Sequence, residues 1–357
     1  MGGRPGAHNA ITDIAGVRVG SAHDAAAWTG VTAILTDAPM TAAADVRGGG
    51  PGTRETDVLD AAGGAPKVDG IILSGGSVYG LDAASAAVRW MGARGRGVKL
   101  IQREDAPPSP IVPSAILYDL ANGGDKSWGE TPPYAALSEA ACAAAMEPEG
   151  VGAPAYGNEG AGYGAQAGAL KGGLGGASFI TEDGLAVGAL IACNAFGSSI
   201  MEGSAAFWAW PYEIDGEFGG ARPGDKPEDR QTGWPAPAAD LPGDTKLKLL
   251  GPRAATTIGV VAVNVDLTPG EAKRVAIMAQ DGLARALRPI HAAVDGDVLF
   301  TLANGERPLD GLGPNQPYAL SRVGSIAADC VARACARAVY EATSLGAARS
   351  YKDVFCA

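Results

Sequence analysis

The sequence divides near residue 255 into two parts that differ in composition and charge. A polar stretch rich in proline and glycine runs from Asp215 to Asp244, and this composition predicts an exposed loop or linker. Soon after it comes the apolar run Thr256-Thr-Ile-Gly-Val-Val-Ala-Val-Asn-Val265, whose β-branched residues predict a buried strand. Residues 256–357 contain equal numbers of basic and acidic side chains, so the formal net charge of -11 comes entirely from residues 1–255.

The residues from this strand onward predict a β-α-β-α tail. Thr268-Pro-Gly-Glu271 places threonine at an N-cap, proline at the first helical position and glutamate at the third. This is a capping box, and it predicts a helix that continues to about Leu287. Asp297–Leu302 predicts a second strand, and apolar residues at helical spacing predict a second helix from Ser321 to about Ser344.

Residues 1–255 alternate between predicted strands and helices in a similar way. Sheets covered by helices explain such alternation, so the fold class is α/β or α+β. The length of 357 residues suits one large domain or two modest ones. The predicted strands are Val17–Ser21, Val31–Thr36, Val68–Leu73 and Leu185–Cys193, and the predicted helices are Ser77 to about Met91 and Ala136–Met146.

Composition excludes several classes of function. The net charge is negative and the basic residues form no cluster, so nucleic acid is not an expected partner. The sequence has neither a long apolar run nor an apolar signal segment at its start, and we therefore expect a soluble, cytoplasmic protein with no membrane contact. Only three histidines and five cysteines without CxxC spacing are present, so neither a metal nor a cofactor is expected.

Two glycine-rich segments resemble catalytic motifs only in part. Ser74-Gly-Gly-Ser-Val-Tyr-Gly80 lies between a predicted strand and helix, but it departs from the G-x-S-x-G nucleophile elbow, and a tight turn is favoured. Gly160-Ala-Gly-Tyr-Gly-Ala-Gln-Ala-Gly168 lacks the preceding strand that a dinucleotide fingerprint requires. The glycines continue past Lys171 in a permissive segment, where that lysine is either a solvated loop residue or a cation in a cleft.

Asp295-Gly-Asp297 and Thr256 are the remaining candidates. Taken alone, the two carboxylates favour a solvated turn, because the oxygen donors of a calcium loop are missing. Thr256 starts a buried strand after small residues and a loop, which is the layout of a latent N-terminal nucleophile. Cleavage before it would create an α-amine with a pKa of about 7.7–8, and this amine would act as the base for the hydroxyl of the same residue. An ordinary strand remains the alternative interpretation.

Several blocks together resemble the self-processing aminopeptidase family that includes L-aminopeptidase/D-esterase, β-peptidyl aminopeptidase and 6-aminohexanoate-oligomer endohydrolase. The blocks follow one another in order along almost the whole chain, which is more specific than any one motif. They are Asn9–Gly20, Ala44–Gly49, Leu73–Leu81, Ser114–Asp119, Gly160–Ala165 with Leu170–Gly175, Asn194, Thr256–Ala262 and His291–Phe300.

The resemblance implies a single-domain precursor, 1–357, that cleaves itself into a large chain 1–255 and a small chain 256–357. It implies an α+β fold, a four-layer α-β-β-α sandwich of the N-terminal-nucleophile type, assembled as a homotetramer. The expected substrate is a small-molecule amide or peptide. The implied roles are Thr256 as nucleophile, Asn194 as side-chain donor of the oxyanion hole, Lys171 as a nearby cation, Asp295 and Asp297 as the acidic pair that orients the nucleophile, and Tyr118 as a substrate-side hydroxyl.

One residue departs from the pattern of the family. The nylon-oligomer branch and many relatives have asparagine before the nucleophile, whereas this chain has Ala255. A natural variant, an engineered block on maturation, or a lineage nearer to ornithine acetyltransferases would each explain it. The sequence therefore supports an N-terminal-threonine amide hydrolase, with an acyltransferase of the ornithine acetyltransferase type and an unprocessed, non-enzymatic relative as alternatives. The aromatic segment Phe207–Tyr212 is a candidate wall of the cleft, although ordinary packing is favoured.

Overall fold

A computed structural model describes residues 2–60, 62–63, 67–101, 103–224, 246 and 255–356. Of the predicted loop Asp215–Asp244, residues 215–224 form turns and irregular backbone, and the rest lies outside the described residues. Within the described ranges, no helix combines the length and apolar character needed to cross a membrane.

The strands form one continuous hydrogen-bonded system in the described residues. Their order is β1-β9-β10-β11-β12-β3-β5-β6-β4, and β2 also pairs with β3. A separate small pair consists of β7 and β8. The bounds are β1 Gly3–Arg4, β2 Val17–Asp24, β3 Thr29–Val46, β4 Thr53–Arg54, β5 Lys67–Ser74, β6 Ser114–Ile116, β7 Gln166–Ala167, β8 Leu170–Lys171, β9 Gly173–Thr181, β10 Ala186–Asn194, β11 Thr256–Val265 and β12 Val298–Arg307.

Strand β3 belongs to two sheet layers. Its first half pairs with β2 and β5, its second half pairs with β12, and the pairing with β5 shifts register between Leu35 and Met40. A buried cluster joins the two layers, because it combines Ile34 and Leu73 from one with Val260 and Phe300 from the other. The strands therefore pack as two facing layers around a central core.

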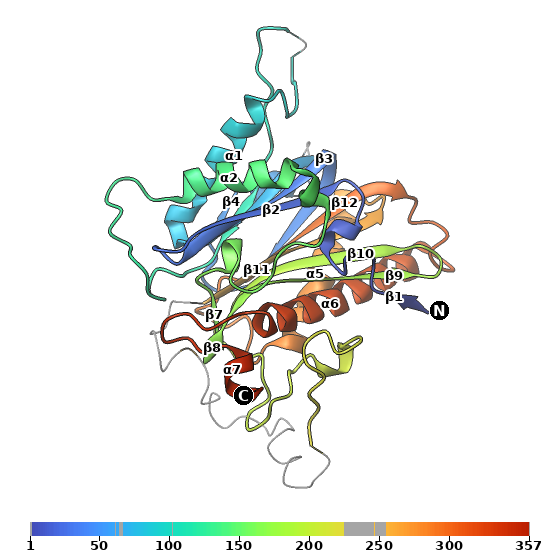
Figure 1. Cartoon of the computed structure of the whole chain (residues 1–357). Helices are drawn as coiled ribbons and strands as arrows, with labels where there is room; N and C mark the ends of the chain where they lie inside the picture. Colours follow the sequence, from blue (N-terminus) through green and yellow to red (C-terminus); the bar gives the residue numbers. More distant parts are fainter. Residues whose placement is uncertain are drawn as a thin grey trace.

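Helices cover the outer face of each layer (Figure 1). A second core lies under α1 and α2, and a third lies under α5 and α6. The fold is thus the four-layer α-β-β-α sandwich, of α+β class, that the resemblance implied. The bounds of the helices are α1 Asp82–Gly92, α2 Tyr134–Met146, α5 Pro269–Ala286, α6 Gln316–Tyr340 and α7 Tyr351–Phe355.

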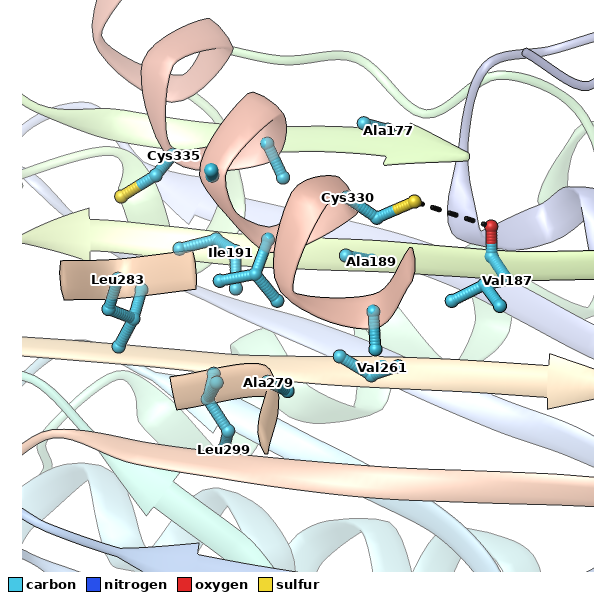
Figure 2. Close-up of a cluster of buried hydrophobic side chains, with 14 of the residues drawn as sticks. Ala177, Val187, Ala189, Ile191, Val261, Ala279, Leu283, Leu299, Cys330 and Cys335 are labelled. Carbon is cyan, nitrogen blue, oxygen red and sulfur yellow. Dashed lines mark hydrogen bonds between the residues drawn. The ribbon is translucent and has the colours of Figure 1, made fainter. Parts of the chain in front are cut away.

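The core beneath α5 and α6 shows how closely these layers approach (Figure 2). Val261 of β11 and Leu299 of β12 pack with Leu283 of α5, and the Cys330 thiol donates to the Val187 carbonyl at 3.7 Å. On β9, a Cβ added to Gly175 would lie 2.3 Å from the Ala334 carbonyl oxygen of α6. Only glycine leaves room for α6 at this point.

Most predicted elements are confirmed, with three corrections. Strand β11 has the predicted bounds, and both hydrogen bonds of the Thr268/Glu271 capping box are present. The segment after Lys171 is a strand rather than a permissive loop, because its glycines serve the contact of β9 with α6. Helix α6 begins before Ser321, because Asn315 caps it through the Tyr318 amide. Ser77–Leu81 forms a 3-10 turn ahead of α1.

Arg333 on α6 is at the centre of a buried polar network. Its guanidinium pairs with Glu217, with Nη2 and Oε2 2.9 Å apart, and also donates to the Ser178 carbonyl at 2.8 Å and to Asn9 Oδ1 at 2.9 Å. These bonds join the N-terminal segment, β9, α6 and the segment before residue 224.

We expect Arg333→Ala to lower the free energy of unfolding by about 3 kcal/mol, because it removes the closer of the two cations beside the largely buried Glu217 carboxylate and leaves only Arg337, at 3.9 Å. Urea titration followed by circular dichroism measures the change. The matched control is Arg285→Ala, which breaks the partly exposed pair with Asp329 and should cost about 0–1 kcal/mol. Equal effects of the two substitutions would contradict this account of Arg333.

Candidate active site

Thr256 and Asn194 lie opposite each other across the β10–β11 ladder. The antiparallel register pairs them directly, at the last residue of β10 and the first of β11. Along these strands, Leu190, Ala192, Ile258 and other even-numbered residues contribute to the central core. Since side chains alternate along a strand, both residues belong to the face that points between the layers. Both are buried.

The Thr256 hydroxyl is held against the peptide that precedes it. Its Oγ1 donates a hydrogen bond to the Ala255 carbonyl oxygen. On another side, the backbone of Gly296 approaches so closely that an added Cβ would lie 2.7 Å from Oγ1. The glycine of Asp295-Gly-Asp297 therefore lets the turn before β12 touch the hydroxyl.

Asp297 fixes the start of β11. Strands β11 and β12 are parallel with Ile258 opposite Val298, and this register brings the residue before β12 to the beginning of β11. Asp297 Oδ1 accepts from the Thr257 amide at 2.7 Å, and Oδ2 faces His291 Nδ1 at 2.9 Å. The carboxylate thus links the backbone beside Thr256 to a histidine.

Asp295 is buried next to Asp297 and accepts two backbone hydrogen bonds. Its Oδ1 accepts from the Phe196 amide at 3.2 Å and its Oδ2 from the Ala292 amide at 3.1 Å. Burial and the neighbouring Asp297 carboxylate raise the pKa of Asp295 to about 7. A carboxylate whose pKa is raised by burial and by a neighbouring carboxylate is typical of functional sites.

The Asn194 side chain is bonded at both ends of its amide. Oδ1 accepts from the Gln166 amide at 2.9 Å and from Lys246 Nζ at 2.7 Å, and Nδ2 donates to the Tyr118 carbonyl at 2.9 Å. Tyr118 therefore meets Asn194 through its main chain. The substrate-side role expected for its hydroxyl stays a prediction.

Two lysines are buried in this region. Lys171 Nζ donates to the carbonyl oxygens of Gly172 at 2.8 Å and Gly162 at 3.2 Å. Burial, reinforced by the positive charge of Lys246, lowers the pKa of Lys171 to about 7. Burial also lowers the pKa of Lys246 to about 7, although nearby acidic groups, including Asp295, oppose that shift.

The structure brings most of the predicted site residues together. Asn194 pairs with Thr256, Asp297 holds the next amide, and the Asp295-Gly-Asp297 turn covers the hydroxyl. Lys171 lies opposite Gln166 in the β7–β8 pair, and the Gln166 amide donates to Asn194 Oδ1. Among the described residues, no group of three or more histidine, cysteine or acidic side chains is arranged to hold a metal ion.

Other motifs have structural explanations. Gly76 has a φ of 84° and its amide donates to Asp119 Oδ1 at 2.8 Å, so the segment after β5 is a tight turn. Phe207 is buried in the core under α6, where it packs against Phe218 and Tyr351. Packing thus explains at least this part of the aromatic segment.

Two residues of the site were missed by the sequence reasoning. Lys246 lies in Asp244-Thr-Lys-Leu-Lys248, which matches no motif, so only the fold reveals it. His291 is the first residue of one of the blocks that carry the resemblance, but it was given no role. Its spacing of six residues from Asp297 was the available signal.

Comparisons with known proteins place the chain in a family. Residues 9–352 match peptidase family S58. An uncharacterised aminopeptidase of Mycobacterium tuberculosis is 39% identical over 366 residues, covering 97% of this chain and 98% of the relative. The 6-aminohexanoate-oligomer endohydrolase of Kocuria sp. (strain KY2) is 29% identical over 300 residues, covering 82% of this chain and 74% of the relative.

The fold also matches a solved structure. The L-aminopeptidase D-Ala-esterase/amidase from Ochrobactrum anthropi, described as a variant of the Ntn hydrolase fold, superposes with a TM-score of 0.69 at 24% identity, covering 97% of this chain and 90% of that one. This likeness supports the four-layer sandwich. The family match over residues 9–352 and the relative that is 39% identical show that the chain belongs to peptidase family S58 and is a hydrolase of that family.

Proposed function

We propose that the chain cleaves itself between Ala255 and Thr256, and that the new N-terminal threonine hydrolyses amide bonds through an acyl-enzyme. The observation that carries the proposal is the buried Thr256 hydroxyl, which lies against the Ala255 carbonyl with Asn194 opposite. Membership of a peptidase family supports the same class of reaction.

Self-cleavage begins with the hydroxyl next to the bond that must break. Thr256 Oγ1 attacks the Ala255 carbonyl carbon and gives up its proton, and the C–N bond breaks as the Thr256 nitrogen takes up a proton. The result is an ester between Ala255 and Oγ1. Water then hydrolyses the ester, which leaves a carboxylate on Ala255, a free hydroxyl and a free α-amine on Thr256.

The mature reaction repeats this chemistry on a substrate. The α-amine, with an ordinary pKa of about 7.7–8, accepts the proton of Oγ1 as the oxygen attacks the substrate carbonyl. The leaving amine takes that proton, an acyl-threonine ester forms, and water hydrolyses it. A nucleophile that carries its own base agrees with a chain that contains only three histidines.

The surrounding groups have distinct roles in this scheme. Asn194 Nδ2 is the side-chain donor for the oxyanion, in place of its present acceptor, the Tyr118 carbonyl. Asp297 orients the nucleophile through the Thr257 amide. Lys171 Nζ donates two hydrogen bonds to carbonyl oxygens. Its charge, or its remaining N–H as a donor, is the cation-type group that the scheme places near Thr256.

The substrate class follows from the relatives. Those with the higher identities are named aminopeptidases, and the more distant ones are named 6-aminohexanoate-oligomer endohydrolases. We therefore propose short peptides, amino-acid amides or linear aminohexanoate oligomers as substrates.

Ala255 supports a second candidate function, acyl transfer. Cleavage between alanine and threonine is the pattern of ornithine acetyltransferases, which would pass the acyl group to an amino-acid amine instead of water. The purified protein, given an acetylated amino acid with and without a free amino acid, distinguishes the two. Faster acetyl transfer than hydrolysis would favour the transferase.

We expect Thr256→Ala to remain one chain of 35.7 kDa and to lose amide hydrolysis, because both reactions use the same oxygen. Denaturing electrophoresis and intact mass measure cleavage, with chains 1–255 and 256–357 as the wild-type products. The control is Thr301→Val, which removes another buried hydroxyl, one without a hydrogen-bond partner among the described residues. Self-cleavage by Thr256→Ala, or an uncleaved and inactive wild type, would contradict the proposal.

We expect Asn194→Ala to lower kcat about 10²–10³-fold, because an oxyanion-hole donor contributes roughly 3–4 kcal/mol to the transition state. Steady-state kinetics on an amino-acid p-nitroanilide measures the change. Asn304→Ala is the control, since it removes a partly exposed asparagine at the far end of β12. A kcat within about threefold of wild type would exclude this role for Asn194.

The lowered pKa of Lys171 predicts how the stability of the folded chain depends on pH. Its pKa is about 7 in the folded chain and about 10.4 when unfolded, so the unfolded state binds more protons between these values. Stability should therefore rise with pH across this window, by up to about 1.4 kcal/mol per pH unit. In the uncleaved Thr256→Ala background, Lys171→Met should reduce the rise and leave the part that comes from Lys246, whose pKa is also lowered to about 7, whereas Lys273→Met should leave the rise unchanged. Urea titrations at pH 7–10 measure the slopes, and an unchanged slope in Lys171→Met would contradict the buried-lysine account.

A further inference from the structure

Lys246 donates hydrogen bonds to Asn194, whose side chain is the oxyanion donor in the proposed mechanism. Its Nζ lies 2.7 Å from Asn194 Oδ1 and 2.9 Å from the Asn194 carbonyl oxygen. The residue is 1% exposed, so these bonds form away from solvent. Neither the family resemblance nor the sequence motifs give Lys246 a role.

These contacts determine which way the Asn194 amide faces. Oδ1 accepts from two donors, Lys246 Nζ and the Gln166 amide. A flipped amide would turn its NH₂ group toward both donors and its oxygen toward the Tyr118 carbonyl, so hydrogen bonds at both ends of the amide would be lost. The ammonium therefore favours the orientation in which Nδ2 lies on the opposite side of the amide, where it donates to the Tyr118 carbonyl.

From this contact set we infer that Lys246 is a positioning residue for Asn194, which fixes and polarises its amide so that Nδ2 serves as the oxyanion donor in self-cleavage and hydrolysis. The inference rests on the proposed function. A charge-assisted hydrogen bond to Oδ1 draws electron density toward the oxygen and makes the amide N–H a stronger donor.

The backbone of Lys246 is tied to the same part of the site. Its amide donates to the Phe196 carbonyl at 3.1 Å, and the Phe196 amide donates to Asp295 Oδ1 at 3.2 Å. Phe196 therefore connects Asp295 to the backbone of Lys246. The attraction between Asp295 and Lys246 offsets part of the cost of burying an ammonium.

Substitutions of Lys246 separate a role of the charge from a role in packing. Methionine keeps the approximate length of the side chain without the ammonium, whereas arginine keeps a cation and donors in a larger group. If the ammonium positions Asn194, Lys246→Met should lower kcat about 10–100-fold, less than loss of the donor itself, with KM changed less than about threefold. Lys246→Arg should keep more activity than Lys246→Met, and self-cleavage should slow in the same order.

A packing role predicts the opposite order, with Lys246→Met near wild type and Lys246→Arg impaired, and that result would overturn the inference. Lys246→Gln, which keeps a neutral donor, replaces Lys246→Met if the latter fails to fold, and its kcat should also fall. The matched control is Lys273→Met, which removes a lysine bonded to the Ala44 carbonyl and to Asp45, outside this site.

Chemical rescue provides a second readout. Lys246→Ala should recover activity with added n-propylamine and not with 1-propanol, because only the amine restores a cation in the vacated space. Rescue by both compounds, or by neither, would overturn the inference. A wild type that neither cleaves itself nor hydrolyses amides would instead refute the proposed function, whereas an active wild type with an equally active Lys246→Met refutes only the role of Lys246.

Discussion

The pairing register of β10, β11 and β12 is the constraint on which the site depends. A shift of one residue between β10 and β11 would turn the side chain of Asn194 or Thr256 toward the opposite face of the sheet. The register is well specified because every residue of β10 and β11 is buried, with one core on each face. The hydrophobic layers thus determine the position of a hydroxyl and an amide that are themselves polar.

Glycine allows these layers to approach each other. A Cβ on Gly20 of β2 would lie 2.2 Å from the Ala141 carbonyl of α2, as one on Gly175 would lie 2.3 Å from the Ala334 carbonyl of α6. Both outer helices therefore rest on the backbone of a sheet. Gly296 makes the same kind of approach at the site, where the turn before β12 touches the Thr256 hydroxyl. Dense packing of the layers and the close contact at the Thr256 hydroxyl both depend on the missing side chain of glycine.

The sequence predicts elements whose signals are local. Strand β11 and helix α5 were predicted because a β-branched run and a capping box act within a few residues. Strand β9 was missed because two of its glycines, Gly173 and Gly175, are explained by close contact with α6, which is distant in the sequence. At the site, the residue pattern suggested Thr256 as a possible nucleophile, and the family resemblance supplied the other roles. Lys246 was not predicted, because the residues next to it in the sequence form no motif that indicates its burial or its contact with Asn194.

The buried charged groups near Asn194 and Thr256 lower the stability of the fold. A lysine whose pKa falls on folding, such as Lys246, destabilises the folded chain fully below about pH 7, and this cost disappears as pH rises toward about 10.4. Asp295, whose pKa rises on folding, has no such cost below about pH 4 and its full cost above about pH 7. Near neutral pH both groups therefore destabilise the folded chain, and attraction between the ammonium and the carboxylate reduces this destabilisation. Packing alone would favour apolar residues at both positions, so the presence of this pair beside Asn194 and Thr256 is better explained by a reaction that moves protons and stabilises a developing negative charge.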